Sequence, residues 1–221
     1  MSRHDTDIDF TPELLLRAYA AGIFPMAETR DTSHVFWVDP KRRGVLPIAD
    51  FHVPRRLRRT VRNDSFDVTC NTDFAEVIAM CAEATKSRTD TWINPSIEDS
   101  VTELHRMGFA HSVECRKDGE LVGGLYGISL GAAFFGESMF SRERDASKVA
   151  LVHLMARLTL GGYRLLDTQF ITDHLAQFGA IEIPAQDYLI ELEDALKYQA
   201  TFPAFANGAQ LEGCLVKILS K

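Results

Sequence analysis

Two carboxylates and one amide stand in apolar surroundings where they could do chemistry. Asp167 and Gln169 lie two positions apart in "YRLLDTQF", a spacing that places both side chains on one face of a strand. Glu137 follows the apolar run "GAAFFG" and precedes "SMF". Because a buried carboxylate needs a partner, these residues predict a site for a cationic or amino-bearing substrate. The alternative for Asp167 and Gln169 is a buried polar pair that only holds a neighbouring loop.

These residues are expected on strands of a mixed sheet beside one central helix. Asp118–Gly119 is a strong hairpin signal, and strand-like and helix-like segments follow it in mixed order. The second half of the chain predicts strands near 111–117, 120–129, 132–136 and 163–170, and helices near 146–160, 173–179 and 186–198. This order indicates a mixed α/β (α+β) fold. It resembles the acetyltransferase (GNAT-like) architecture, in which a bent sheet opens a groove beside a central helix.

The first half predicts smaller elements and a basic helix. "VFWV" (35–38) and "VLPI" (45–48) have the composition of short strands. Pro54 begins a helix with five arginines between 55 and 62. We therefore expect three parts: a small N-terminal α/β domain with the basic helix (1–63), an acetyltransferase-like catalytic domain (64–200) and a C-terminal tail (201–221).

Composition and charge are those of an ordinary globular chain with one basic segment. The 221 residues are 46% hydrophobic and 25% charged, with a net charge of −7, which argues against nonspecific nucleic-acid binding. Residues 41–62 nevertheless carry eight lysines and arginines against one aspartate. They predict a local contact with a polyanion, and a solvated helix face is the alternative. The polar first residues and the lack of a long apolar stretch predict a cytoplasmic protein without membrane contact, and we expect a monomer.

Patterns for metals and nucleotide cofactors are missing. The four cysteines form no CxxC, and no His/Cys/Asp/Glu cluster has metal-ligand spacing. Neither GxxxxGK(S/T) nor a strand-borne GxGxxG occurs. A coenzyme-A acetyltransferase would carry a Gly-rich loop before the 146–160 helix, where this chain reads "SRERDASK". Without GxSxG, a hydrolase triad is also not expected. The sequence predicts no metal and no cofactor.

Several motifs together resemble one known family. "AYAAGIFPM", "DTWI", "HSVE", "LVGGLYG", "FFGESMFSRERDASKVAL" and "LLDTQFITDHLAQFGAIEIP" occur in this order between about residues 11 and 188. They are similar to motifs of the leucyl/phenylalanyl-tRNA–protein transferases. The resemblance implies transfer of Leu or Phe from charged tRNA to the N-terminal Arg or Lys of a protein, which marks that protein for degradation in the N-degron pathway. It also implies that no metal or nucleotide cofactor takes part.

The resemblance gives roles to individual residues. Asp167 and Gln169 match the catalytic pair of the family, and Glu137 matches a glutamate near the aminoacyl group and the incoming amine. The positions that match the aminoacyl pocket are Leu125, Phe134, Met139, Leu154 and Leu166, and those that match the tRNA contacts are Met26, Trp92, Arg55, Arg59 and Arg62. The chain departs from well-known members at Met26, where they have a stacking tryptophan, and at Leu154, where they have an aromatic residue.

Two other functions fit parts of the sequence. A coenzyme-A-dependent N-acyltransferase would have the same fold, but "SRERDASK" argues against it. A non-enzymatic RNA-binding module would use the basic helix and leave Glu137 and Asp167 without a chemical role. The transferase reaction needs only modest help with proton removal, because about a tenth of an α-amine with a pKa near 7.7–8.0 is already unprotonated at pH 7. A carboxylate hydrogen-bonded to an amide, as expected of Asp167 with Gln169, is suited to align the amine and accept its proton. Glu137 fits equally well as a partner of the cationic N-terminal residue of the acceptor.

Overall fold

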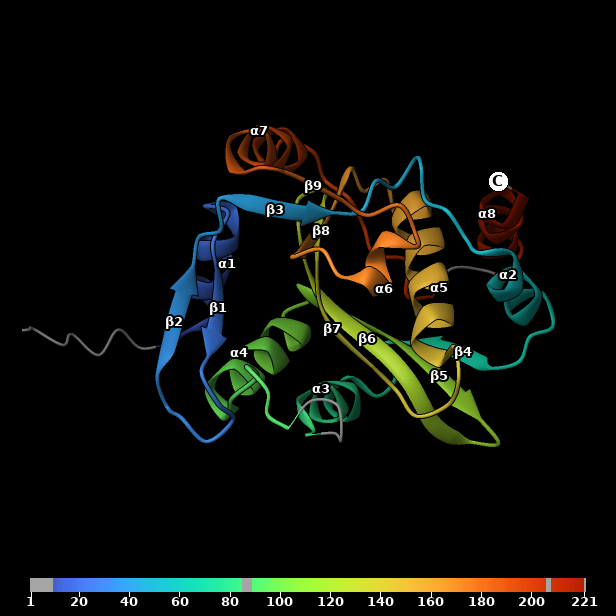
Figure 1. Ribbon diagram of the computed structural model, residues 1–221, viewed down its shortest axis with the longest axis horizontal. Helices are drawn as coiled ribbons and strands as arrows, with labels where there is room; N and C mark the ends of the chain where they lie inside the picture. Colours follow the sequence, from blue (N-terminus) through green and yellow to red (C-terminus); the bar gives the residue numbers. More distant parts are fainter. Residues whose placement is uncertain (1–9, 85–88, 206–207, 221) are drawn as a thin grey trace, which may run out of the picture.

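The hairpin of β5 (Ala110–Lys117) and β6 (Glu120–Leu130) forms at the predicted turn. Asp118 and Gly119 have φ angles of 53° and 84°, the backbone of the two-residue turns that match the twist of antiparallel strands. The computed structural model describes residues 10–84, 89–205 and 208–220. In this part of the chain the hairpin lies in a seven-stranded sheet with the order β4-β5-β6-β7-β8-β3-β9 (Figure 1). The other strands of this sheet are β3 (Arg42–Val45), β4 (Asp67–Cys70), β7 (Ala133–Ser141), β8 (Leu165–Gln169) and β9 (Ile181–Pro184).

Helices cover both faces of the sheet. α5 (Ala146–Gly161) is apolar on nearly all sides, as expected of a buried helix. It packs between the sheet and α8 (Gly208–Ser220), and α2 (Arg55–Arg62) lies beside it. The opposite face is covered by α1 (Pro12–Ala20), α3 (Phe74–Ala82), α4 (Pro95–Arg106) and α7 (Ala185–Leu196). Each face therefore has an apolar core of its own.

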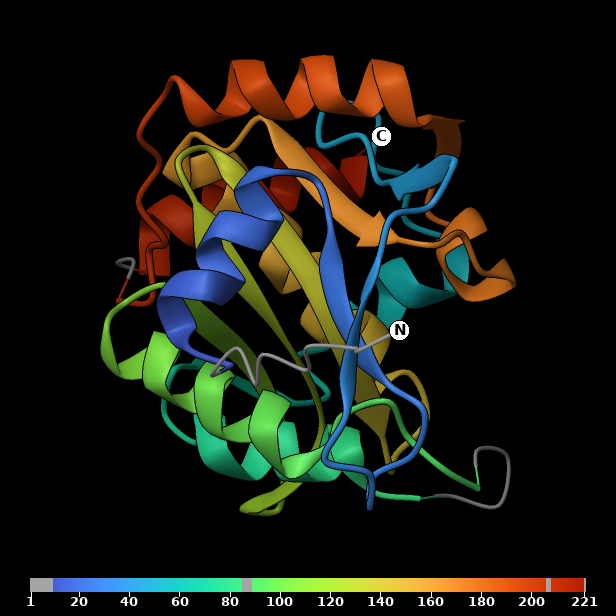
Figure 2. The same ribbon diagram turned by 90° about the vertical axis from the view of Figure 1, so that its left-hand side faces the viewer.

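The hairpin of β1 (Phe24–Ala27) and β2 (Val35–Val38) forms a separate two-stranded sheet. Figure 2 looks onto this hairpin, with α7 above it and α4 below it. The backbone amide of Ala27 donates to the carbonyl of Trp92 at 3.1 Å, which fixes the segment before α4 against β1.

β7 and β8 separate after a short contact, and this separation creates space for a site. The two strands pair in parallel only over Ala133–Phe135 and Leu165–Asp167. β7 then continues beside β6 as far as Ser141, whereas β8 pairs on its other side with β3. The parallel pair thus diverges toward the ends of both strands. This divergence agrees with the bent sheet that the sequence predicts.

The N-terminal segment contributes to the main sheet. β3 pairs with β8 and β9, and it begins three residues earlier than the predicted strand at 45–48. The division of the chain at residues 63 and 200 stays a prediction. After residue 200, Phe202 stacks on Phe134, and α8 packs on α5.

The mixed sheet and its helices confirm the predicted mixed α/β class. In the described part of the chain, no helix combines the length and the apolar composition needed to span a membrane.

Candidate active site

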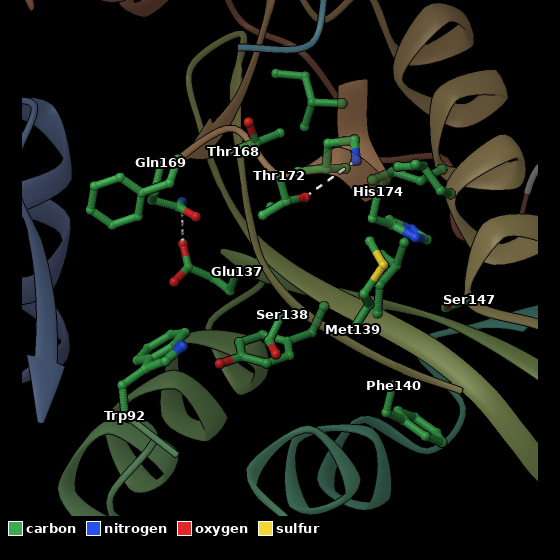
Figure 3. A pocket seen from close by; sticks show the side chains of 18 of the residues that line it. Trp92, Glu137, Ser138, Met139, Phe140, Ser147, Thr168, Gln169, Thr172 and His174 are labelled. Atoms are coloured by element: carbon green, nitrogen blue, oxygen red, sulfur yellow. Dashed lines mark hydrogen bonds between the residues drawn. The ribbon is translucent and has the colours of Figure 1, made fainter. Parts of the chain in front are cut away.

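A cavity of about 780 Å³ lies where β7 and β8 diverge (Figure 3). Most of its lining is apolar. The side chains that the sequence predicts for an aminoacyl pocket and that line this cavity are Leu125 of β6, Met139 of β7, Leu154 of α5 and Leu166 of β8. Met26 and Trp92 line it as well, and Trp92 is held beside β1 by the Ala27 contact. The cavity therefore joins an apolar wall next to α5 with an aromatic and thioether surface next to β1.

A carboxyl and an amide meet across this cavity. The amide nitrogen Nε2 of Gln169 lies 3.3 Å from Oε1 of Glu137, and Figure 3 shows the two side chains pointing toward each other from β8 and β7. The hydroxyl of Tyr19, a residue of α1 that is only 1% exposed, also hydrogen-bonds to Glu137. Glu137 thus has two neutral donors and an open side toward the cavity.

The surroundings of Glu137 favour its neutral form. Its side chain faces the cavity, but protein atoms crowd the carboxyl, and this burial raises its pKa to about 8. The hydrogen bond from Tyr19 lowers the pKa, the negative charge of Asp167 raises it, and the positive charge of Arg43 lowers it. A carboxyl with this pKa exchanges a proton near neutral pH. Burial also raises the pKa of Tyr19, and the charge of Glu137 adds to this increase.

Asp167 lies beneath the cavity and does not line it. It is fully buried, and Arg43 of β3 donates to it from Nε at 2.9 Å and from Nη2 at 2.6 Å. The hydroxyl of Tyr188 donates to Oδ2 at 2.6 Å. The backbone amide of Gln169 donates to Oδ1 at 2.8 Å. Both carboxylate oxygens therefore have protein partners.

Gln169 has an unusual backbone for a strand residue. Its φ angle is 56°, in the left-handed region that L-residues other than glycine rarely adopt. The expectation that Asp167 and Gln169 share one strand face is therefore wrong, because this conformation breaks the alternation. Leu166 and Gln169 both line the cavity, whereas Asp167 lies below it.

Comparison with known proteins assigns the chain to a family. A sequence model described as "Leucyl/phenylalanyl-tRNA protein transferase" matches residues 45–193, and the model of the N-terminal domain of the same family matches residues 8–41. The chain belongs to this family. The protein named leucyl/phenylalanyl-tRNA–protein transferase in Paramagnetospirillum magneticum is 60% identical to this chain over 199 residues, which are 90% of this chain and 95% of that protein. The protein of the same name in Rhodopseudomonas palustris is 60% identical over 203 residues, which are 92% of this chain and 91% of that protein.

Structural likeness is more distant. The solved structure of the C-terminal domain of a putative lysylphosphatidylglycerol synthetase from Agrobacterium fabrum superposes on this chain with a TM-score of 0.46 and 14% sequence identity. The match includes 84% of this chain and 69% of that one. The membership in the leucyl/phenylalanyl-tRNA protein transferase family thus rests on sequence.

Some residues singled out by resemblance to the family lie away from the cavity. Phe134 is fully buried and does not line it; its ring packs against Tyr163 and Phe202. Arg55 and Arg59 are exposed on α2, outside the cavity lining. Arg62 is exposed too, but its Nη2 donates to the carbonyl of Leu219 in α8 at 3.0 Å.

The structure also adds residues that the sequence analysis missed. The sequence groups Arg43 only with the basic segment and gives no signal for Tyr19 and Tyr188, because the importance of these residues comes from contacts with residues far along the chain. Thr168 and His174 line the cavity. Their Oγ1 and Nε2 atoms are buried and have no hydrogen-bond partner among the described residues.

Within the described residues, no group of three or more His, Cys, Asp or Glu side chains could hold a metal ion. The polar groups that line the cavity include the carboxyl of Glu137, the amide of Gln169, the hydroxyl of Thr168 and the imidazole of His174, and most of the remaining lining is apolar.

Proposed function

We propose that this chain transfers Leu or Phe from charged tRNA to the N-terminal amine of an acceptor protein that begins with Arg or Lys, and that it does so as a cytoplasmic monomer. The observation that carries the proposal is the Glu137–Gln169 pair beside an apolar wall, in a chain of this family. The apolar wall suits the side chain of the donor amino acid. The carboxyl and amide suit the arriving amine. The product carries a new N-terminal residue that marks it for degradation.

The reaction is the aminolysis of an ester. The acceptor nitrogen attacks the ester carbonyl, a C–N bond forms, and the bond from the carbonyl carbon to the ribose oxygen breaks. Glu137 accepts the proton that the attacking nitrogen loses and returns it to the ribose oxygen as it leaves. Its pKa of about 8 lies close to the 7.7–8.0 of the protonated α-amine, so the carboxylate form of Glu137 takes a proton from an ammonium group at little free-energy cost. The ester is activated already, so no energy source is needed.

Gln169 orients the reacting groups. Its Nε2 donates to Glu137 at 3.3 Å, which leaves the amide oxygen to accept a hydrogen bond from the attacking amine. Holding amine and ester in one geometry contributes more than proton transfer, since effective concentrations can lower a barrier by up to about 7–11 kcal/mol.

The apolar wall selects the donor side chain by size and shape. An apolar pocket discriminates by only about 1–3 kcal/mol per methylene, so we expect transfer from Met-tRNA as well as from Leu-tRNA and Phe-tRNA. Val and Ile, which branch at Cβ, are expected to be excluded by shape.

The RNA is bound outside the apolar wall. A splayed 3′ base stacks on Trp92, with the thioether of Met26 beside it, as single-stranded RNA ends often stack on aromatic side chains. Arg55, Arg59 and Arg62 on α2 bind phosphates, which gives affinity without sequence information.

A coenzyme-A-dependent acyltransferase is not favoured. Residue Asp145 occupies the N-cap of α5 with a φ angle of 67°, and its carboxylate pairs with Lys148 at 3.1 Å. An acid at this position opposes a pyrophosphate, which would need positive charge or free backbone amides there.

The test is transfer of radiolabelled amino acid from Leu-, Phe-, Met- and Val-tRNA to peptides that begin with Arg, Lys, Asp or Glu. We expect labelling of the Arg and Lys peptides by the first three donors, and its loss after ribonuclease treatment of the donor. Labelling of acidic peptides in preference to basic ones would overturn the acceptor assignment. Acylation by acetyl-coenzyme A without RNA would overturn the reaction.

A further inference from the structure

Arg43, Asp167 and Tyr188 form a closed polar unit below the cavity. Each is at most 2% exposed. Arg43 binds Asp167 through Nε and Nη2 at 2.9 and 2.6 Å, and its Nη1 donates to the carbonyl of Gly22 at 2.9 Å. The guanidinium lies between two rings, 4.5 Å from the centroid of Phe24 and 4.6 Å from that of Tyr188. The unit therefore joins β3, β8, α7 and the turn after α1.

Asp167 has no oxygen left for a substrate. A carboxylate offers about four acceptor sites. Oδ1 accepts from Arg43 and from the backbone amide of Gln169, and Oδ2 accepts from Arg43 and Tyr188. Asp167 is also absent from the lining of the cavity. It cannot touch the attacking amine while these contacts hold, so any effect on the reaction passes through its neighbours.

The neighbour with the most direct link is Gln169. Asp167 accepts its backbone amide hydrogen at 2.8 Å, at the residue whose φ angle is 56°. A left-handed conformation at a residue with a Cβ costs about 1–2 kcal/mol and persists only where the surroundings impose it. The cost is offset here by the hydrogen bond to a carboxylate that is itself locked on both oxygens.

We propose that Arg43, Asp167 and Tyr188 act as one positioning unit that holds Gln169 in its left-handed turn and thereby aims the Gln169 amide at Glu137. This inference rests on the proposed function, since it assigns Glu137 and Gln169 to the reacting groups. Asp167 is then a positioning residue and not the proton acceptor. The negative charge of Asp167 also raises the pKa of Glu137.

The mildest test is Tyr188→Phe, which removes one hydroxyl and keeps the ring against Arg43. Tyr163→Phe is the matched control, because Tyr163 is also buried and its hydroxyl bonds Ser129 at 2.6 Å, away from the cavity. We expect Tyr188→Phe to lower kcat about five- to tenfold with unchanged KM for Leu-tRNA. Displacement of the Gln169 amide lowers the rate of the reaction more than the affinity for the substrate. Tyr163→Phe is expected to keep the wild-type kcat. Equal kcat values for the two variants would overturn the proposal.

Asp167→Asn adds a test of the unit. We expect it to lower kcat about 100-fold and the double variant with Tyr188→Phe to be no slower, because residues that act as one unit are not additive. Multiplicative losses in the double variant would show independent roles and contradict a single unit.

The pH profile separates positioning from proton transfer. An acceptor peptide with an N-terminal aminooxy group has a nucleophile that stays unprotonated over the tested range, so kcat reports the enzyme alone. The wild-type kcat should rise with pH through about 8, where Glu137 loses its proton. In Asp167→Asn the rise should remain and move to lower pH, because the negative charge that raises the pKa of Glu137 is gone. Loss of the rise would mean that Asp167 is the base.

The outcomes keep this inference apart from the proposed function. If wild-type protein does not label basic peptides from charged tRNA, the proposed function fails. If it labels them but Asp167→Asn removes the pH-dependent rise, only the positioning unit fails.

Discussion

Nε2 of Gln169 lies 3.3 Å from Oε1 of Glu137 across the gap between β8 and β7. The contact joins two strands at the point where their backbone pairing has ended. Because the two side chains meet at the cavity, a substrate that binds beside the pair can contact both at once. The geometry of this pair therefore depends on the divergence of the strands as well as on the side chains.

Replacing the carboxyl of Glu137 tests its part in proton transfer. Glu137→Gln keeps the size of the side chain and removes the proton acceptor, so we expect kcat to fall by about 10²–10⁴-fold, the usual contribution of a positioned base. Binding of Leu-tRNA should change little. Glu143→Gln is the control, since Glu143 is an exposed acid that pairs with Lys117 at 3.3 Å. Single-turnover transfer would be measured for both variants. A transfer rate of Glu137→Gln within threefold of the wild-type rate would remove Glu137 from the mechanism.

The same substitution should stabilise the fold at high pH. Burial raises the folded-state pKa of Glu137 to about 8 from an ordinary value of 4.5, so the folded state holds a proton that the unfolded chain releases. Its contribution to stability is complete below the ordinary pKa and is lost as the pH rises through about 8. Glu137→Gln avoids this loss. We expect its Tm to equal that of wild type near pH 4 and to exceed it by at least about 2–4 °C at pH 9. Parallel Tm curves across this range would contradict the raised pKa.

Local signals in the sequence account for much of the fold. Asp118–Gly119 predicts its hairpin because two positive φ angles in succession are costly for most residues. The helix predicted at 146–160 is α5 (Ala146–Gly161), because an apolar segment of that length with a glycine stop has few alternatives. The residue types also single out Asp167, Gln169 and Glu137 as candidate site residues, but they give no sign that Arg43 and Tyr188 bind Asp167 beneath the cavity.

Contacts between distant residues could not be read from the same signals. Arg43 and Asp167 are 124 positions apart, and nothing in the sequence around Arg43 distinguishes it from the exposed arginines of α2. The left-handed turn at Gln169 also has no signal of its own, since it depends on a locked carboxylate below. Resemblance to the family predicts Phe134 in the pocket. In the structure Phe134 does not line the cavity, and Phe202 stacks on its ring with a centroid distance of 5.8 Å.

The size of the apolar wall should decide between donors. Leu154 of α5 is 1% exposed and lines the cavity. Leu154→Ala enlarges the pocket, so we expect the ratio of kcat/KM for Phe-tRNA over Leu-tRNA to rise about tenfold. Leu158→Ala is the control, because Leu158 is buried one turn further along α5 and does not line the cavity. Both variants lose stability, but only the first should change the ratio in competition assays.

Phosphate binding by α2 should appear as a dependence on salt. Arg55 and Arg59 are exposed on this helix. Their joint replacement by alanine should reduce the slope of log K against log salt concentration by about 1.5, the release expected for two phosphate contacts. Arg106→Ala is the control, because Arg106 is exposed on α4 and pairs with Glu103 at 2.9 Å. Binding of charged tRNA at several salt concentrations would give the slopes, and an unchanged slope in the Arg55, Arg59 double variant would place the RNA elsewhere.

Gly44 should be required for the turn at Gln169. A Cβ at Gly44 would lie 2.6 Å from the carbonyl carbon of Phe170 and 2.9 Å from the amide of Ile171, so the backbone after Gln169 would have to move. We expect Gly44→Ala to lower kcat at least tenfold and the free energy of unfolding by about 1–3 kcal/mol. Gly213→Ala on α8 is the control: nothing lies within 4 Å of the added Cβ, and alanine favours a helix by up to about 1 kcal/mol. Wild-type kcat in Gly44→Ala would show that the left-handed turn tolerates displacement and is not what positions the amide.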